Sequence, residues 1–399
     1  MLNILYIVGE TIPGGTAATY RITGEARELM KLGHNVTVLA NRGPGQKKDE
    51  IYKGVHIIRN KIRFGAYFSI LHSLKALTRR SFIKKQDVIL ERFSPIGGAG
   101  AILSKIFDIP LVLEFIGPHV EEAIDQGDVK NHLLIAMLKK LRDFQYNQAD
   151  ILDVPLRSIV PKRYDSKTIE IIEGTDPDIM KPRGEMPDRV KKNIKNLLDA
   201  RKRNKNLRCF IFHGSFCPWH GAEDILPIAK KYVNDKDMHF MIVGNIPDRV
   251  YDFVKTNNLS NITLVSYVPY EDMAYYIQTA DIGLTPFNTN KYRILRKLGF
   301  WWIPCKGLEY MSMEKPIVTP GHPILKRCYG PTNFFYKIDD SKALEKAIIT
   351  ASKETLARLH ERGKKNRTRI INNYQWSNYM TVLLAEIDKA IKRRVGTKK

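Results

Sequence analysis

Lys306 and Glu309 are the two residues whose types and spacing best suit a chemical role. They stand in CKGLEYMSMEKPIVTP, Cys305 to Pro320, ahead of an apolar run that reads as a buried strand. Residues three apart share one face of a helix, so the pattern places a cation and a carboxylate together where a helix begins. Cations and helix N-termini attract phosphate, and carboxylates accept hydrogen bonds from sugar hydroxyls. The segment predicts a site for phosphate and sugar hydroxyls, with a surface ion pair as the alternative.

Two further groups of residues follow stretches that read as strands. Glu114 and His119 come at the end of and after residues 110–115, and Gly14 and Gly15 follow residues 2–9. Ligands of open α/β sheets bind beyond the carboxyl ends of the strands. The two glycines let the backbone approach a ligand closely, although their spacing matches neither the dinucleotide fingerprint nor a Walker A loop. A flexible turn and an ordinary loop histidine are the alternatives.

Length and composition favour a two-domain protein. The chain has 399 residues, which is longer than a single hydrophobic core normally supports. Its 43% of hydrophobic residues are enough to form sizeable cores. No apolar run approaches the roughly 18 residues of a membrane-spanning helix. The N-terminus lacks a basic n-region and a cleavage site, so we expect a first strand rather than a signal peptide. The four cysteines have no paired metal-ligand spacing and are expected to be free thiols of a cytosolic protein.

The formal net charge of +23 indicates an anionic partner: nucleic acid, an anionic membrane surface or phosphorylated substrates. Solubility alone is the alternative. Residues 61–85, KIRFGAYFSILHSLKALTRRSFIKK, hold seven Lys or Arg and no acid, interleaved with apolar residues. This composition predicts a basic amphipathic helix at a membrane surface. The alternative for 61–85 is a helix that packs its apolar face on a sheet. The basic C-terminal tail would either add attraction to an anionic surface or fray.

Short apolar strands alternate with helices along both halves of the chain. This order predicts two doubly wound α/β domains facing each other across a cleft. We place the boundary near residue 180, in the turn-rich EGTDPDIMKPR, and expect charged helical structure over 188–206. The expected strands are 2–9, 35–40, 55–59, 87–91, 110–115, 150–155 and 168–172, then 208–213, 238–243, 261–265, 282–284, 316–319 and 334–338.

The order of motifs resembles glycosyltransferase family 4, the retaining group 1 glycosyl transferases of GT-B fold. The resemblance runs over nearly the whole chain and rests on six segments taken together. They are EARELMKLGHNVTVLA, DVILERFSPIGGAG with IPLVLEFIGPHVEE, IIEGTDPDIMKP, FIFHGSFCPWHGAEDIL, NITLVSYVPYEDMAYYIQTADIGLTPF and KGLEYMSMEKPIVTP. It implies domains over 1–180 and 181–373 that are Rossmann-like, and a helix over 374–399 that crosses back to the first domain.

The resemblance also implies roles for single residues. Glu309 would accept hydrogen bonds from the ribose of a donor nucleotide, and the backbone of Gly244 and Val268 would line the base pocket. Gly214 and Ser215 would meet the diphosphate. The glycine loop, Gly14 with Gly15, would approach the phosphate from the other domain. Cations and helix N-termini, rather than a metal, would neutralise the leaving group.

Several positions depart from the family pattern. Trp301 stands where the family often carries a first glutamate that contacts the donor sugar. The donor loop has His220 before a glycine where Arg or Lys is common, so it carries a charge only if the imidazole is protonated. Lys306 is then the candidate for the main phosphate cation. The acceptor-side histidine of the family usually lies near Ile116, and we take His119 as its candidate substitute.

The sequence predicts a cytoplasmic glycosyltransferase at the inner face of the cell membrane. It would move a hexose-type sugar, with retention, from a UDP- or GDP-sugar to a lipid-linked or cell-surface glycan acceptor. We expect no metal, no other cofactor and no nucleic-acid partner, and an anionic membrane contact through 61–85. A nucleotide-sugar 2-epimerase of the same fold is the first alternative. A basic nucleic-acid-binding protein is the second, disfavoured because the aromatic residues do not fall on an exposed sheet platform.

Overall fold

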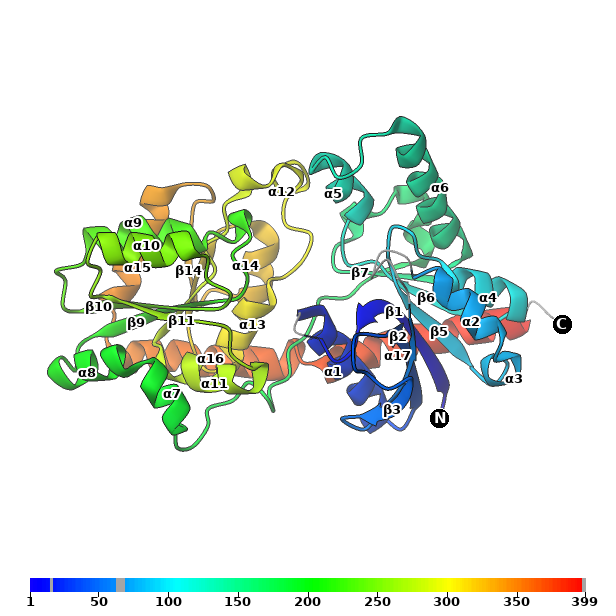
Figure 1. The fold of residues 1–399 in the computed structure, drawn as a ribbon, viewed down its shortest axis with the longest axis horizontal. Helices are drawn as coiled ribbons and strands as arrows, with labels where there is room; N and C mark the ends of the chain where they lie inside the picture. The colour runs from blue at the N-terminus through cyan, green and yellow to red at the C-terminus, as the bar shows by residue number, and fades with distance from the viewer. Residues whose placement is uncertain (15–16, 62–68, 397–399) are drawn as a thin grey trace. The chain divides into compact units, whose positions relative to one another are not determined.

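The computed structural model describes residues 1–14, 17–61 and 69–396, which form two compact units (Figure 1). Unit 1 comprises Met1–Glu173 and Trp376–Lys399, and unit 2 comprises Gly174–Gln375. Each unit has a sheet with helices on both faces. The α/β class predicted from the order of strands and helices is confirmed.

The sheet of unit 1 has eight strands in the order β3-β4-β2-β1-β5-β6-β7-β8. Neighbouring strands are parallel except for the antiparallel pair β3–β4. The sequence did not predict β3, because its acidic residues have low strand propensity. A tight turn with positive φ at Lys53 and Gly54 pairs it with β4. The strands are β1 Asn3–Thr11, β2 Asn35–Asn41, β3 Asp49–Tyr52, β4 Val55–Asn60, β5 Val88–Arg92, β6 Leu111–Glu114, β7 Ile151–Val154 and β8 Thr168–Glu170.

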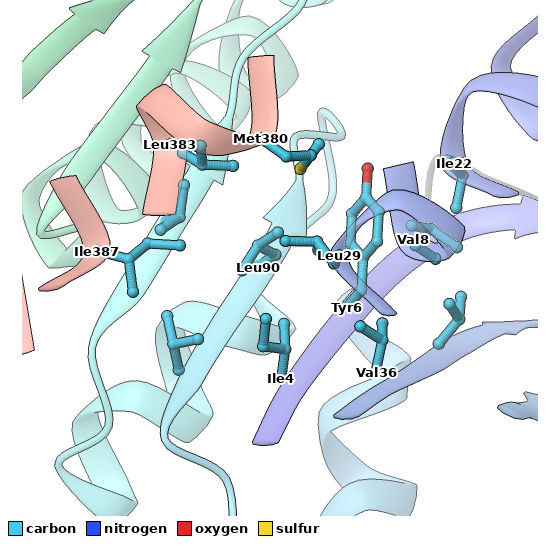
Figure 2. Packing of buried hydrophobic residues seen from close by; sticks show 14 of the residues in the cluster. Ile4, Tyr6, Val8, Ile22, Leu29, Val36, Leu90, Met380, Leu383 and Ile387 are labelled. Atoms are coloured by element: carbon cyan, nitrogen blue, oxygen red, sulfur yellow. The ribbon is translucent and has the colours of Figure 1, made fainter. Parts of the chain in front are cut away.

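Helices cover both faces of this sheet. The helices are α1 Ala17–Lys31, α2 Leu71–Leu77, α3 Arg80–Ile83, α4 Ala99–Phe107, α5 His119–Asp125, α6 His132–Gln148 and α17 Trp376–Gly396. Side chains alternate along β1, so Ile4, Tyr6 and Val8 face α1 and α17 (Figure 2), whereas Leu5 and Ile7 join the core under α2 to α6. The C-terminal helix thus supplies part of the core of the N-terminal unit.

The predicted amphipathic helix over 61–85 is not one helix where it is described. Residues 62–68 lie outside the described residues. The rest forms α2 and the short α3, and the chain departs from helical geometry at Arg79 between them. Helix α2 buries His72, Ser73 and Ala76, and α3 buries Ile83. This part of the segment packs on the sheet, as the alternative interpretation had it, and its contact with a membrane remains a prediction.

The sheet of unit 2 has six parallel strands in the order β11-β10-β9-β12-β13-β14. They are β9 Arg208–His213, β10 Met238–Val243, β11 Ile262–Val265, β12 Ile282–Leu284, β13 Ile317–Pro320 and β14 Phe334–Tyr336, close to the predicted ranges. The helices are α7 Asp188–Asn193, α8 Lys195–Arg203, α9 Ile225–Lys231, α10 Asp248–Thr256, α11 Tyr270–Thr279, α12 Arg293–Leu298, α13 Cys305–Ser312, α14 Pro323–Tyr329, α15 Ser341–Ser352 and α16 Leu356–Asn373.

The chain passes between the units twice, after Glu173 and after Gln375. The two passages lie together in unit 2, because Thr175 pairs with Gln375 and its N–H donates to the carbonyl of Tyr374 at 2.8 Å. The predicted boundaries, after residues 180 and 373, lie near these two points in the sequence. Among the described residues, no helix is both long and apolar enough to span a bilayer.

Candidate functional site

Helix α13 carries Lys306 and Glu309 into the interior of unit 2. Both side chains are buried, with Lys306 9% exposed and Glu309 7% exposed, so they are not a surface ion pair. The helix sits against β12 because Gly283 leaves room for Tyr310, where a Cβ atom would lie 2.3 Å from the ring. The Tyr310 hydroxyl accepts a hydrogen bond from the N–H of His213 at 2.9 Å. This packing places the first turn of α13 at the carboxyl end of β9.

Glu309 is held by two side chains from other elements. Its Oε1 accepts a hydrogen bond from the hydroxyl of Tyr270, the first residue of α11, at 2.7 Å. Its Oε2 lies 3.1 Å from Nε2 of His213, the last residue of β9. Burial raises the pKa of Glu309, but the contacts with His213 and Tyr270 and the nearby Lys306 outweigh it and lower the pKa. The group is therefore a fixed, charged hydrogen-bond acceptor.

Lys306 lies in apolar surroundings. Its Nζ is 4.2 Å from the ring centre of Phe212 and 5.7 Å from that of Phe287. No described residue accepts a hydrogen bond from this buried ammonium group. Burial lowers the pKa of Lys306 to about 7, although the Glu309 carboxylate opposes the change. A buried cation without a hydrogen-bond partner has the chemistry of a site that an anion completes.

Two glycines bring the backbone to the same place. Gly214 follows β9 with φ +126°, and Gly244 follows β10 with φ +149°, a region that favours glycine. A Cβ atom on Gly244 would lie 2.2 Å from the carbonyl oxygen of Gly214, and one on Gly214 would lie 3.4 Å from the Lys306 Nζ. The Gly214–Ser215 backbone therefore runs past the ammonium group with no side chain in the way.

His220 stabilises the loop after β9. Its Nδ1 lies 3.0 Å from both the hydroxyl and the carbonyl oxygen of Ser215. Burial and the nearby Lys306 lower the pKa of His220 to about 3, so its ring is neutral at physiological pH. The histidine fixes Ser215 but brings no positive charge to the site.

Similarity to known proteins indicates the class of the protein. Residues 208–354 match the family described as glycosyl transferases group 1. They are a group 1 glycosyltransferase domain. The chain is a glycosyltransferase, as the order of motifs predicted. No curated protein matches the sequence of the chain.

Solved structures similar to this glycosyltransferase cover nearly all of it. A sucrose-phosphate synthase from Thermosynechococcus elongatus is 17% identical, with a TM-score of 0.69 over 98% of this chain and 100% of that one. A glycosyltransferase from Rickettsia africae is 15% identical, with a TM-score of 0.69 over 98% and 99%. HepE of Anabaena, solved with UDP and glucose, is 13% identical, with a TM-score of 0.68 over 98% and 100%. At these identities the likeness shows the fold, which is GT-B.

In this glycosyltransferase an aromatic cluster occupies the place of the family's first glutamate. Trp301 is 3% exposed and packs on Tyr292 and Trp302. Tyr292 stacks on Trp219, in the segment after β9, with ring centres 4.2 Å apart. Phe287 joins the cluster to Lys306. The side chain at position 301 is therefore buried and aromatic, where the resemblance implies a carboxylate.

The remaining predicted site residues lie in unit 1 or beside α11. His119 begins α5, and its Nδ1 lies 2.6 Å from Oε2 of Glu122 while its ring stacks on Phe93. Gly14 lies against the carbonyl of Thr11, where a Cβ atom would be 2.6 Å away. Gly15 lies outside the described residues. Val268 is half-buried in the loop before Tyr270.

The sequence prediction missed His213, Tyr270 and Phe212 as neighbours of Lys306 and Glu309 in the candidate site. Each stands where a strand ends or a helix begins, and this position is the only signal that the sequence offers for them. Within residues 1–14, 17–61 and 69–396, no group of three or more His, Cys, Asp or Glu side chains is arranged to hold a metal ion. The expectation of metal-independent transfer stays a prediction.

Proposed function

We propose that unit 2 binds a UDP- or GDP-sugar with its nucleotide at the first turn of α13. The observation that carries the proposal is the juxtaposition of Glu309 and Lys306 at the end of β9. Glu309 is a buried carboxylate held in place by Tyr270, and it would accept hydrogen bonds from the ribose hydroxyls. Val268 and Gly244, on the loops after neighbouring strands, would line the base.

The diphosphate would lie between Lys306 and the Gly214–Ser215 backbone. The buried ammonium group would gain an anionic partner, and the φ of Gly214 leaves the backbone open to close approach. The neutral His220 would position Ser215 rather than bind phosphate by charge. Lys306 would then stabilise the negative charge that develops on the leaving nucleoside diphosphate, a role that needs no metal.

We further propose that the sugar moves with retention of configuration to a lipid-linked or glycan acceptor, as in family 4. Two structures of similar fold contain such donors or their parts: HepE contains UDP and glucose, and a trehalose-6-phosphate protein from E. coli contains UDP-2-fluoro glucose. A hexose-type donor is consistent with both. The net charge of +23 supports an acceptor at an anionic membrane surface in the cytoplasm. His119 is the proposed acceptor-side residue of unit 1.

Calorimetry of UDP and GDP binding tests the nucleotide site. Because Glu309 and Lys306 each lose a charge-assisted interaction when truncated, Glu309→Ala and Lys306→Met are expected to weaken binding by about 10- to 100-fold. Glu361→Ala on α16, whose side chain is 65% exposed, is the matched control and is expected to bind like wild type. Wild-type affinity in both site variants would rule out this location.

A panel of nucleotide sugars identifies the donor and separates the two enzyme interpretations. A transferase is expected to hydrolyse its donor slowly when no acceptor is present. A 2-epimerase would instead convert the donor sugar to its C2 epimer at full rate under the same conditions. Rapid epimer formation, followed by NMR of the sugar, would contradict the proposed transfer.

A further inference from the structure

The first turns of α6 present apolar side chains to solvent. Leu133 is 80% exposed, Leu134 is 37% exposed and Met137 is 48% exposed. Together with Lys130, Lys139 and Lys140, which are also exposed, they form what we call the α6 tip. A fully buried leucine stabilises a protein by about 1.5–3 kcal/mol relative to an exposed one. Because Leu133 is 80% exposed, its side chain contributes almost none of this stabilisation to unit 1.

The exposed residues are held in place by a well-formed helix. The side chain of Asn131 caps α6 by accepting hydrogen bonds from the N–H groups of Leu133 at 2.9 Å and Leu134 at 3.1 Å. The opposite side of the helix buries Leu138 and Tyr146 in the core of unit 1. In Figure 1 the first turns of α6 stand away from the sheet of unit 1. The leucines are therefore displayed on a rigid element rather than on a loose loop.

Positive charge predominates around these residues. The stretch 129–141, VKNHLLIAMLKKL, contains three lysines and no acid. Two acids of α5 are paired, Glu121 with Arg142 and Glu122 with His119. Asp128, just before the stretch, is an exposed acid that the three lysines outnumber. An apolar helix face flanked by lysines is the pattern of a helix that lies in the surface of an anionic membrane.

We propose that the α6 tip inserts Leu133, Leu134 and Met137 into the surface of a membrane that contains anionic lipids. This inference rests on the proposed function in one respect, since a lipid-linked acceptor would be reached from such a surface. It is distinct from the predicted contact through 61–85, whose described part buries one side on the sheet. A second copy of the chain is a poorer occupant, because a two-fold interface would bring the lysines of both tips together.

Co-sedimentation of the full chain with lipid vesicles tests the proposal. The vesicles consist of phosphatidylcholine alone or of phosphatidylcholine mixed with phosphatidylglycerol. Leu133→Gln/Met137→Gln is expected to weaken binding to the anionic vesicles by tenfold or more, and Lys139→Gln/Lys140→Gln is expected to weaken it severalfold. The matched control is Leu32→Gln/Val382→Gln, which removes exposed apolar side chains elsewhere in unit 1 and is expected to bind like wild type.

Each other outcome counts against the α6 tip. Unchanged binding of Leu133→Gln/Met137→Gln, with loss in Arg79→Gln/Arg80→Gln/Lys84→Gln/Lys85→Gln, would place the contact on 69–85 instead. Loss of a dimer in sedimentation velocity, without loss of vesicle binding, would identify a second copy as the occupant. Circular dichroism establishes that every variant is folded.

Nucleotide binding distinguishes failure of this inference from failure of the proposed function. Calorimetry without vesicles is expected to give wild-type UDP or GDP affinity for the α6 variants. If the wild-type chain binds vesicles through α6 but binds no nucleotide, the proposed donor site fails and the membrane surface stands. If the wild-type chain binds nucleotide, but the α6 variants bind vesicles as well as wild type does, the membrane contact through α6 fails and the donor site stands.

Discussion

At the scale of single residues, burial disfavours the charge of both Lys306 and Glu309, and their different contacts decide which group stays charged. The Glu309 carboxylate has contacts from His213 and Tyr270 that keep it charged. The Lys306 ammonium has aromatic neighbours and no hydrogen-bond acceptor among the described residues, so burial favours its neutral form. Such a lysine costs stability in the empty protein and recovers it when an anion binds.

The pKa of Lys306 predicts that donor binding weakens as pH rises above about 7. Below that value the amine is already protonated and binds the diphosphate directly. Above it, binding must take up a proton, so affinity is expected to fall by up to about tenfold per pH unit. Calorimetry with a nucleotide sugar, whose phosphates do not titrate in this range, measures the slope. In Lys306→Arg the guanidinium remains protonated and the slope is expected to vanish; an equal slope in both proteins would contradict the role of Lys306.

At the scale of elements, helix α1 is tied to the strands of unit 1 by a buried network of charges. Arg21 of α1 pairs with Glu25 at 2.6 Å and with Glu114 of β6 at 2.5 Å, and it also pairs with Glu173. The hydroxyl of Tyr6 lies 2.7 Å from Glu25 and 2.6 Å from Glu114. One hydroxyl has a single proton to donate, so this arrangement favours protonation of one of the two carboxyl groups. Glu25 fits this role, because burial raises its pKa to about 7.

Asp153 of β7 predicts how the stability of unit 1 depends on pH. Burial raises its pKa from 3.8 to about 8, although the hydrogen bond from Tyr379 opposes this. Between these values the folded state holds a proton that the unfolded state has released. The stabilisation is full below about pH 4 and is lost as pH rises through about 8, by up to about 1.4 kcal/mol per pH unit.

Urea unfolding at several pH values, monitored by hydrogen exchange of the strand amides of unit 1, checks this dependence. Asp153→Asn keeps an acceptor for Tyr379 and removes the titration, so its stability is expected to change less between pH 5 and pH 8. Glu25 and Glu91, whose pKa values burial raises to about 7, keep part of the slope in the variant. A variant with the full wild-type slope would exclude Asp153 as a source.

At the scale of the whole molecule, the chain completes unit 1 only at its end. Helix α17 returns to unit 1 after Gln375 and contributes buried side chains to the same core as β1 and α1 (Figure 2). These side chains are Trp376, Tyr379, Met380, Leu383, Ile387 and Ala390. Unit 2, in contrast, is one continuous stretch of chain. The two units therefore depend differently on the C-terminus.

A chain that ends at Gln375 tests this dependence. Without α17, one face of the sheet of unit 1 loses its cover, and burial of each large side chain contributes about 1.5–3 kcal/mol. For the five large side chains the loss is about 7.5–15 kcal/mol, comparable with the roughly 5–15 kcal/mol that stabilises a typical domain. Unit 1 is expected to become sensitive to protease, while unit 2 stays resistant. A protease-resistant fragment that contains β1 to β8 would contradict the prediction.

The sequence by itself determined most of the strands, the two α/β sheets and the pairing of Lys306 with Glu309 on one helical turn. These features follow from local patterns: apolar runs, turn residues and a spacing of three. It did not predict β3, whose pairing depends on the turn at Lys53 and Gly54, nor the break between α2 and α3.

Only the tertiary structure decided what the site residues can do. Folding places Phe212 against the Lys306 ammonium and the Tyr270 hydroxyl on the Glu309 carboxylate, although both residues are distant in the sequence. The same packing makes His220 neutral and buries Trp301. Charge and pKa depend on burial and on neighbours across the fold, so residue type and spacing could pair Lys306 with Glu309 but could not establish their electrostatics.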